Sequence, residues 1–375
     1  MTISITGWGL ATPLGLSAPE TWQNLLAGRA ILNHSRVPII LPPNRTRVNH
    51  LALIAAREAL ARSHWTNDEI QCDFTALVIG TSKGPIEDWL TGEKPNSPTI
   101  NNGSDLRAGY GLSQTSTALS SDLGLGMGPR LILSAACASG LHALIRAVLM
   151  LKSGQVKRAL VVAVESSLHP LFLGCFQRLG VLAEPEIGCK PFDEHRDGFH
   201  MSEAAAAVCL EAANDPDDLF SRVSIERFAM GGTAGHLTAG EADGAVLCHL
   251  LSRVIDDRPV DLIHAHGTGT QVNDAVELSA IEWALGNRQQ SELPILYSHK
   301  GALGHSLGAA GLVAVVLNCL MHTSDVVPPN VKTTTPLPMR QVTLSQQLIQ
   351  RPIRRSIAAA TGFGGPTAVV SIVKN

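Results

Sequence analysis

The stretch LILSAACASGLHALIRAVLML, from Leu131 to Leu151, joins an apolar run, a turn of small residues and an amphipathic segment without a break. The run at 131–133 is typical of a buried strand, and the small residues around Cys137 allow a tight turn with the sulfur at its apex. Apolar side chains then recur at helical spacing, at Leu141, Leu144, Ile145, Val148 and Leu151. The stretch predicts a strand, a turn and a helix, with Cys137 where the helix begins.

Cys137 has two interpretations at this point. A thiol at the start of a helix lies near unpaired backbone N–H groups and the positive end of the helix dipole, and both favour the nucleophilic thiolate. Alternatively, Cys137 is a small buried apolar residue, as free cysteines usually are. The stretch alone leaves both interpretations open.

Composition places the chain among soluble globular proteins. It has 375 residues, enough for two units with their own cores or one large duplicated domain. Hydrophobic residues make up 45% and charged residues 16%, and the 34 glycines indicate many tight turns. A formal net charge of −3 gives no basic field for nucleic acid or anionic membrane, so we expect small molecules or other proteins as partners.

Cysteine usage and apolar segments indicate a cytoplasmic protein. The seven cysteines are odd in number and form no CxxC pair, which argues against a disulfide framework or a zinc ribbon. The first segment, MTISITGWGLATPLG, has no basic start and is broken by glycines and Pro13, so we expect a strand and a turn rather than a signal peptide. The uncharged stretch from Gly301 to Met321 approaches the ~20 residues that span a bilayer. Its glycine-rich, polar first part favours a buried core helix, and we predict no membrane span.

Strands and helices alternate twice along the chain, which predicts an α/β core of two similar halves. We place the first half at 1–213 and the second at 214–375, with a polar connection from Ala213 to Phe220. The halves share a pattern and no sequence identity. The segments from Asn33 to Asn49 and from Lys83 to Gly111 are expected to be loops, the latter covering a pocket or meeting a partner.

Two histidines lie in glycine-rich loops after predicted strands. His266 follows a strand in VDLIHAHGTGT, where Thr268 and Thr270 add hydroxyl groups, and His305 lies in SHKGALGHSLGAAG, five residues after Lys300. A solitary histidine is usually a hydrogen-bonded core residue. Two histidines in glycine-rich loops after strands weigh against that interpretation, because α/β proteins place their sites at the carboxyl ends of strands.

A zinc site is the alternative use of these residues. Cys137, His266 and His305 could supply three ligands, but they lie far apart in sequence and lack the local ligand pairs of a dedicated site. We therefore predict no metal site.

Five sequence blocks carry a resemblance to a known family. They are SAACASG at 134–140, KPFDEHRDGF at 190–199, HAHGTGTQVNDAVE at 264–277, SHKGALGHSLGAAG at 298–311 and GFGG at 362–365. In this order they resemble the β-ketoacyl-acyl-carrier-protein synthases, condensing enzymes of the thiolase superfamily. The resemblance implies a five-layered αβαβα thiolase-like fold of two pseudo-repeated halves, and a decarboxylating Claisen condensation in fatty-acid, polyketide or polyene synthesis.

The resemblance also implies roles for individual residues. Cys137 matches the acylated nucleophile, and His266 and His305 match the histidines of the malonyl half-reaction. Lys300 matches the residue that supports the second histidine. Phe363 matches a gating residue whose backbone N–H completes an oxyanion hole with that of Cys137.

Substrates and partners follow from the same resemblance. Thr268, Thr270 and Gly364 match substrate-binding positions, the threonines beside the phosphopantetheine arm of acyl carrier protein. No cofactor is expected to be bound permanently. Acyl carrier protein is the implied partner, together with a second ketosynthase-like chain in a homodimer or heterodimer. His305 stands where initiating ketosynthases carry asparagine, and no cysteine accompanies GFGG as in thiolases, which favours the elongating type.

Departures from the family pattern keep an alternative open. Ala314 stands where the family usually has a glutamate that pairs with the lysine, and Ser202 and Ala204 replace two glycines. The segment from Lys83 to Gly111 is also shortened. These changes favour a chain-length-factor-like, non-condensing partner subunit, whereas retention of Cys137 favours an active enzyme.

Overall fold

The computed structural model describes residues 2–43, 45–91, 111–213, 223–234, 244–286 and 292–375. The first half contains five strands: β1 (Thr2–Ala11), β2 (Thr75–Gly80), β3 (Arg130–Leu133), β4 (Arg158–Glu165) and β5 (Ala204–Ala213). Its helices are α1 (Ala18–Leu26), α2 (Arg47–Ser63), α3 (Asn67–Ile70), α4 (Ile86–Thr91), α5 (Ser113–Leu123), α6 (Ser139–Lys152) and α7 (Pro170–Arg178).

The second half repeats the alternation. Its strands are β6 (Val223–Gly231), β7 (Leu262–His264), β8 (Ile295–Tyr297), β9 (Val326–Val327), β10 (Thr343–Leu344), β11 (Ile349–Gln350), β12 (Arg355–Thr361) and β13 (Thr367–Lys374). Its helices are α8 (Ala245–Val254), α9 (Gln271–Leu285), α10 (Lys300–Leu303), the 3₁₀ turn η2 (Leu307–Ala309) and α11 (Ala310–Ser324).

Strand pairing shows the internal repeat. In the first half β1 pairs antiparallel with β5 and β5 with β4, followed by the parallel strands β2 and β3. In the second half β6, β13, β12, β7 and β8 take the same order and the same directions. A short antiparallel contact between β1 and β6, with Ile3 opposite Ile225, joins the two sets into one 11-stranded sheet.

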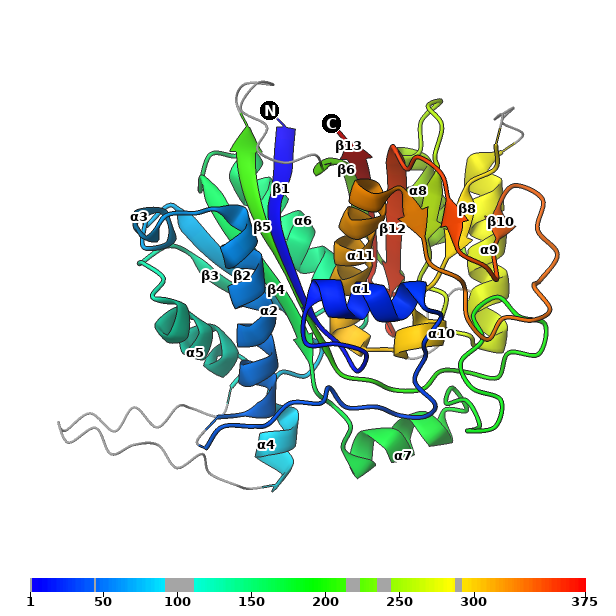
Figure 1. Ribbon diagram of the computed structural model, residues 1–375, viewed down its shortest axis with the longest axis horizontal. Coiled ribbons are helices and arrows are strands. Elements are labelled where there is room, and N and C mark those ends of the chain that lie inside the picture. Colours follow the sequence, from blue (N-terminus) through cyan, green and yellow to red (C-terminus); the bar gives the residue numbers. More distant parts are fainter. Residues whose placement is uncertain (1, 44, 92–110, 214–222, 235–243, 287–291) are drawn as a thin grey trace.

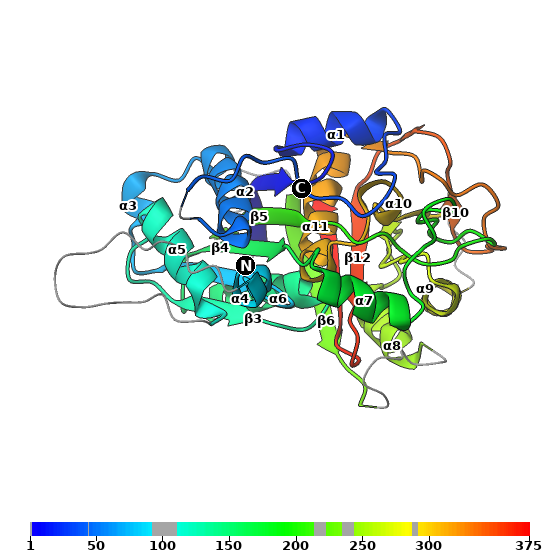
Figure 2. The same ribbon diagram turned by 90° about the horizontal axis from the view of Figure 1, so that it is seen from below.

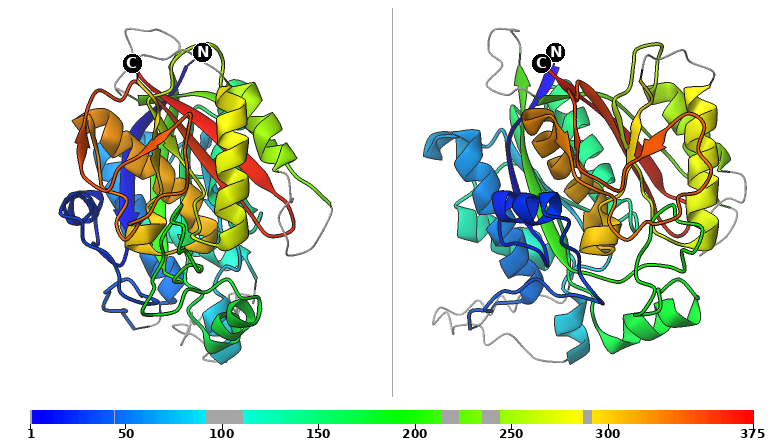
Figure 3. Two further views of the ribbon diagram at one scale, coloured as in Figure 1. Left: turned by 90° about the vertical axis from the view of Figure 1, so that its right-hand side faces the viewer. Right: turned by 45° about the vertical axis from the view of Figure 1, so that its right-hand side comes forward.

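The helices form three layers around the two sets of strands (Figure 1). Helices α6 and α11 pack against each other in the centre, α2 and α5 cover one outer face, and α8 and α9 cover the other. The right-hand view of Figure 3 shows the same sequence of layers. The predicted five-layered, thiolase-like α/β fold of two repeated halves is confirmed.

Helix α11 forms the middle of the core. The stretch Leu307–Ser324 is long and apolar enough to cross a membrane, but 89% of it is buried inside the protein. Residues 310–322 are all buried, because strands surround the helix on both sides. The sequence-based prediction of a core helix here is confirmed.

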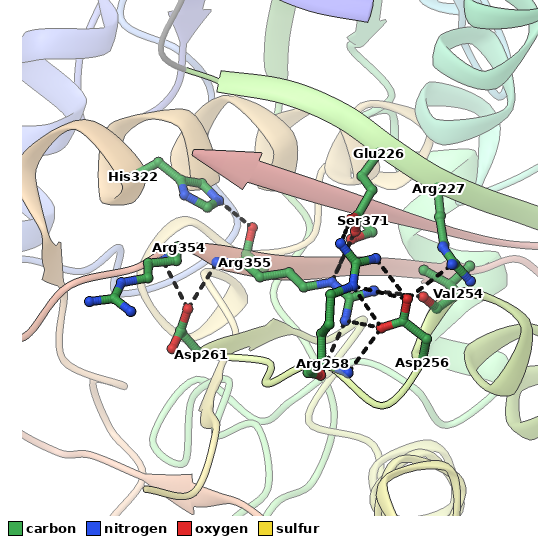
Figure 4. Close-up of polar contacts among 11 residues, drawn as sticks. Glu226, Arg227, Val254, Asp256, Arg258, Asp261, His322, Arg354, Arg355 and Ser371 are labelled. Carbon is green, nitrogen blue, oxygen red and sulfur yellow. Dashed lines mark hydrogen bonds and ion pairs between the residues drawn. The ribbon is translucent and has the colours of Figure 1, made fainter. Parts of the chain in front are cut away.

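Arg355, at the start of β12, is the buried centre of an ionic cluster whose other members are partly exposed (Figure 4). Its guanidinium donates to Glu226 on β6, to Asp256 after α8 at 2.8 Å, and to the carbonyl of Val254 at 3.0 Å. Arg258 also pairs with Asp256. The cluster fastens the outer helix α8 to the strands at the end opposite the carboxyl ends of the parallel strands, and we assign it a structural role.

Some elements differ from the sequence-based expectation. The expected loop from Asn33 to Asn49 ends early, because α2 begins at Arg47 with Thr46 as its N-cap. The expected loop from Lys83 contains helix α4, and its residues 92–110 lie outside the described residues, as does the connection from 214 to 220. Helix α7 was not expected, although Pro170 at its first turn is an ordinary helix-start signal; its cap, His169, is an unusual one.

Candidate active site

Cys137 lies in a strained turn between β3 and α6. Ala136, directly before it, has a φ of +47°, in the left-handed region that residues with a side chain rarely adopt. The hydroxyl of Ser139 holds the turn, accepting from the N–H of Ala135 at 2.9 Å and donating to the carbonyl of Ala136 at 2.6 Å. The turn places the sulfur at the N-terminus of α6, as the sequence predicts.

The electrostatics of Cys137 differ from the prediction. Its side chain is 7% exposed, and burial raises the pKa of the thiol to about 11. The cations of Lys83 and Lys300 and the backbone N–H of Phe363 act in the opposite direction and lower the pKa. The expectation that the helix start makes this thiol acidic is therefore wrong in its net direction, because desolvation outweighs the groups that favour the thiolate.

The loop after β7 holds His266 through its backbone. The N–H groups of His266 and Gly267 donate to the two carboxylate oxygens of Glu277, on α9, at 2.6 and 2.7 Å. Lys300 donates from Nζ to the carbonyl of His266. The imidazole takes no part in these contacts, so its position is fixed while its ring stays available.

His305 lies beside His266, at the end of a second loop. Its N–H donates to the carbonyl of His200 at 2.7 Å, and its carbonyl accepts from Ser202 at 3.1 Å. The rings of His305 and His266 have centroids 5.3 Å apart and planes at 82°. Burial, followed by the charge of Lys300, lowers the pKa of both histidines well below the usual value, so both imidazoles are neutral at neutral pH.

The structure places Lys300 against the backbone of His266, where the family usually pairs it with a glutamate. Ala314 is buried in α11, and burial lowers the pKa of Lys300. The charge of Glu277, on α9, is the first of the influences that raise this pKa. Sequence reasoning did not assign this residue, although Asp274 and Glu277 are three residues apart in a helix and so share one face.

Glu277 gives a pH prediction. Burial raises the pKa of Glu277 to about 7, above the ~4.3 of an exposed carboxyl, so between these values the folded state holds a proton that the unfolded state has lost. The free energy of unfolding should therefore fall as pH rises through this window, and Glu277→Gln should lack this contribution. Denaturant unfolding at about pH 5 and about pH 7.5 should show the wild type losing stability relative to the variant. If wild type and Glu277→Gln differ by the same free energy of unfolding at both pH values, the raised pKa of Glu277 is contradicted.

A cavity of about 510 Å³ connects these residues. Cys137, His266 and His305 line it together with Phe363, Thr268 and Thr270. The two threonine hydroxyls lie 3.0 Å apart, and Asp274 accepts the N–H of Gly269 between them at 3.0 Å. The predicted substrate-binding residues Thr268 and Thr270 therefore face the same space as the sulfur and the two imidazoles.

The loop between β12 and β13 closes the cavity beside the sulfur. Phe363 donates its backbone N–H toward the sulfur of Cys137, and Gly362 and Gly365 also line the cavity. Gly364 has a φ of +81° and belongs to this turn, but it does not line the cavity. All the predicted site residues except Lys300 and Gly364 line the cavity. Lys300 binds the backbone of His266 behind the cavity wall, whereas Gly364 does neither.

Gly362 allows the loop to lie against the Cys137 turn. A Cβ at this position would lie 2.8 Å from the carbonyl of Ala135 and 3.1 Å from the N–H nitrogen of Cys137. We expect Gly362→Ala to lower the rate of Cys137 acylation about tenfold or more, because the loop must move and carry the Phe363 N–H away. Quench-flow acylation kinetics measure this. Gly174→Ala, in open space on α7, is the matched control and should react at the wild-type rate.

Comparison with known families agrees with this geometry. The family described as "Beta-ketoacyl synthase, N-terminal domain" matches residues 42–215, and "Beta-ketoacyl synthase, C-terminal domain" matches residues 229–334. The chain belongs to the beta-ketoacyl synthase family. It is an acyl-transferring condensing enzyme with the thiolase-like fold.

Relatives of this ketoacyl synthase cover nearly the whole chain. The 3-oxoacyl-[acyl-carrier-protein] synthase 2 of Coxiella burnetii is 27% identical over 89% of each chain, and that of a Synechocystis species is 25% identical over 99% of this chain and 98% of its own. A solved type II polyketide acyl-carrier protein in complex with its ketosynthase, bound to the hexaketide, matches with a TM-score of 0.85 and 25% identity over 100% of this chain and 99% of that one. The ishigamide ketosynthase/chain length factor shares the fold, with a TM-score of 0.84, 21% identity and coverage of 100% and 99%.

Proposed function

We propose that this ketoacyl synthase is an active elongating enzyme, which condenses an acyl group on Cys137 with a malonyl group carried by acyl carrier protein. The observation that carries the proposal is the convergence of three distant segments, around Cys137, His266 and His305, on one cavity. The neutral state of both imidazoles supports it, because each can then donate one N–H to a developing oxyanion.

The first step is acyl transfer to Cys137. The thiolate attacks the carbonyl carbon of the acyl thioester, and the charge on the carbonyl oxygen is stabilised by the backbone N–H groups of Cys137 and Phe363. The bond to the phosphopantetheine sulfur then breaks. The proton lost by Cys137 is balanced by the one that the departing sulfur takes up.

The second step is decarboxylation followed by condensation. The bond between the carboxylate and the α-carbon of the malonyl thioester breaks, carbon dioxide leaves, and the electron pair forms an enolate whose oxygen lies between His266 and His305. The α-carbon then attacks the acyl carbonyl on Cys137. A new carbon–carbon bond forms, the bond to sulfur breaks, and Cys137 is released as the thiolate.

Lys300 and the threonines have supporting roles in this proposal. Lys300 holds the carbonyl of His266 and lies beside Glu277, so it fixes the histidine loop. Thr268 and Thr270 offer hydroxyls to the phosphopantetheine arm as it enters the cavity. The substrates arrive on this arm, and no other cofactor is required.

A second ketosynthase-like chain is the proposed partner at the edge of the sheet. Strand β3 is the last strand on its side, and its residues Leu131, Ile132 and Leu133 are half-buried in the single chain. An unpaired apolar edge favours pairing with another chain. We propose a dimer, of like or unlike chains, in the cytoplasm, and acyl carrier protein as the transient partner.

One experiment separates the active enzyme from a chain-length-factor-like subunit, the alternative that Ala314 and Ser202 favour. The purified chain is incubated with acyl-[acyl-carrier-protein] and analysed by intact mass spectrometry and peptide mapping. Acylation of Cys137 in the isolated chain, followed by product on addition of malonyl-[acyl-carrier-protein], supports the proposal. Absence of acylation, alone and with candidate partner chains, would overturn it.

A further inference from the structure

Lys83 is a charged residue beside the site to which neither the sequence nor the proposed mechanism gives a role. It follows β2, whose end pairs with the end of β3, so its loop lies next to the Cys137 turn. The N–H of Thr81 donates to the carbonyl of Leu133 at 3.1 Å, and the hydroxyl of Ser134 donates to the carbonyl of Ser82 at 3.3 Å. The loop of Lys83 is therefore held against the segment that leads from β3 into the Cys137 turn.

A buried carboxylate fixes the same loop to the histidine segment. Glu165, fully buried at the end of β4, accepts the N–H of Ser82 at 2.9 Å and the N–H of Gly308 at 3.2 Å. Gly308 lies three residues after His305. The loop of Lys83 is thus tied on one side to the Cys137 turn and on the other to the His305 loop.

The ammonium of Lys83 rests on an aromatic surface that reaches the reacting groups. Its Nζ lies 5.1 Å from the ring centroid of Phe172 and 5.7 Å from that of Phe176, both on α7, and donates to the hydroxyl of Ser82 at 3.0 Å. The ring of Phe176 stacks on Phe363 at 6.1 Å. In Figure 1 and Figure 2, α7 lies at the same end of the molecule as α4, the helix that follows Lys83 in the chain.

Phe199 extends this surface to the second histidine. Its ring meets Phe176 edge-on at 5.9 Å and His305 edge-on at 4.9 Å. Cys137 packs in the same cluster of side chains as Phe176 and Phe199. Packed rings lower the local dielectric, and a half-buried cation beside them acts on a nearby charge more strongly than one in bulk solvent.

We propose that Lys83 is a positioning residue of the acyl-transfer step, whose ammonium stabilises the thiolate of Cys137 from the side of the aromatic cluster. Cys137 needs such help, because its burial disfavours the charged sulfur. Of the charges that act on the sulfur, those of Lys83 and Lys300 favour the thiolate and that of Glu165 opposes it, with the neutral His266 and His305 alongside. Lys300 is already engaged with the carbonyl of His266, so the cation that we assign to the thiolate is that of Lys83.

The test measures the reactivity of the Cys137 thiolate. The rate at which iodoacetamide alkylates Cys137 is followed by peptide mass spectrometry between about pH 6 and about pH 10. Alkylation consumes the thiolate, forms a sulfur–carbon bond and releases iodide, and it needs neither acyl carrier protein nor turnover. Although the inference rests on the proposed function, this readout can fail or succeed independently of condensation.

Three variants distinguish charge from packing. Lys83→Met keeps an apolar stem on the two rings and should lower the alkylation rate near pH 7.5 about fivefold or more, with the pH profile shifted upward. Lys83→Arg keeps the charge and should retain most of the rate. Lys152→Met is the matched control: Lys152 also lies on a phenylalanine, 5.2 Å from the ring of Phe228, but at the far end of α6, about 22 Å along the helix.

Each outcome decides the inference. A loss with methionine, recovery with arginine and no effect of Lys152→Met support it. Equal rates and profiles for wild type and Lys83→Met overturn it. An equal loss with arginine also overturns it, since the loop geometry would then matter rather than the charge, and so does an equal loss in the Lys152→Met control.

Discussion

Replacing Cys137 with alanine is expected to abolish condensation, with at least a ~10³-fold loss of rate, because the proposed mechanism carries the acyl chain on this sulfur. The sulfur is the only atom removed, and the turn that holds it depends on Ser139 and on backbone contacts that alanine preserves. The fold should therefore persist. Product formation is measured from acyl- and malonyl-[acyl-carrier-protein], and the acyl adduct by intact mass.

The matched control uses an exposed thiol. Cys175 on α7 is exposed and could be acylated without specific binding, so Cys175→Ala should keep both the mass increment and the condensing activity. Thermal unfolding of Cys137→Ala should resemble that of the wild type. Condensation at the wild-type rate by pure Cys137→Ala protein would end the covalent mechanism.

Replacing His266 with alanine should separate the two half-reactions. The backbone groups of this residue bind Glu277 and Lys300, and alanine keeps them, so only the imidazole is lost. Because the proposed enolate then loses one donor, we expect condensation to fall about 10²- to 10³-fold. Acylation of Cys137 should stay close to the wild-type rate, so the acyl-enzyme should accumulate when malonyl-[acyl-carrier-protein] is added.

The control for this variant is an exposed histidine. His249 on α8 faces solvent, and His249→Ala should leave both half-reactions unchanged. The two rates are read separately, acylation by mass spectrometry and decarboxylation by release of labelled carbon dioxide. Loss of acylation equal to the loss of condensation would show that His266 acts before the malonyl step, contrary to the mechanism proposed here.

Much of the fold could be predicted from the sequence because its apolar segments are strongly patterned. The apolar stretch of α11 is buried as expected, whereas β3, before Cys137, forms a strand but lies half-buried at the edge of the sheet rather than inside it. Helix α7 was missed since its apolar face is incomplete: Leu171 is exposed, and Phe176 is its one buried side chain, with Phe172 and Leu173 only partly buried against the same cluster. A pattern search for buried faces does not find such a helix.

The sequence predicts which residues form the site, but not how burial and neighbouring charges set the pKa of each one. Motifs placed Cys137 and His266, whereas the high pKa of the thiol follows from burial that only packing reveals. The same holds for Glu277, whose link to Lys300 depends on how α9 lies against the loop after β7. Long-range pairing of this kind has no local sequence signal.

The short pairing of β1 with β6 has a consequence for how this enzyme can change. One half carries Cys137 and the other His266 and His305, yet the two share hydrogen bonds between strands and a common pair of central helices. A foreign half would bring an unmatched strand edge and an unmatched central helix. We therefore expect exchange of one half alone to destabilise the fold.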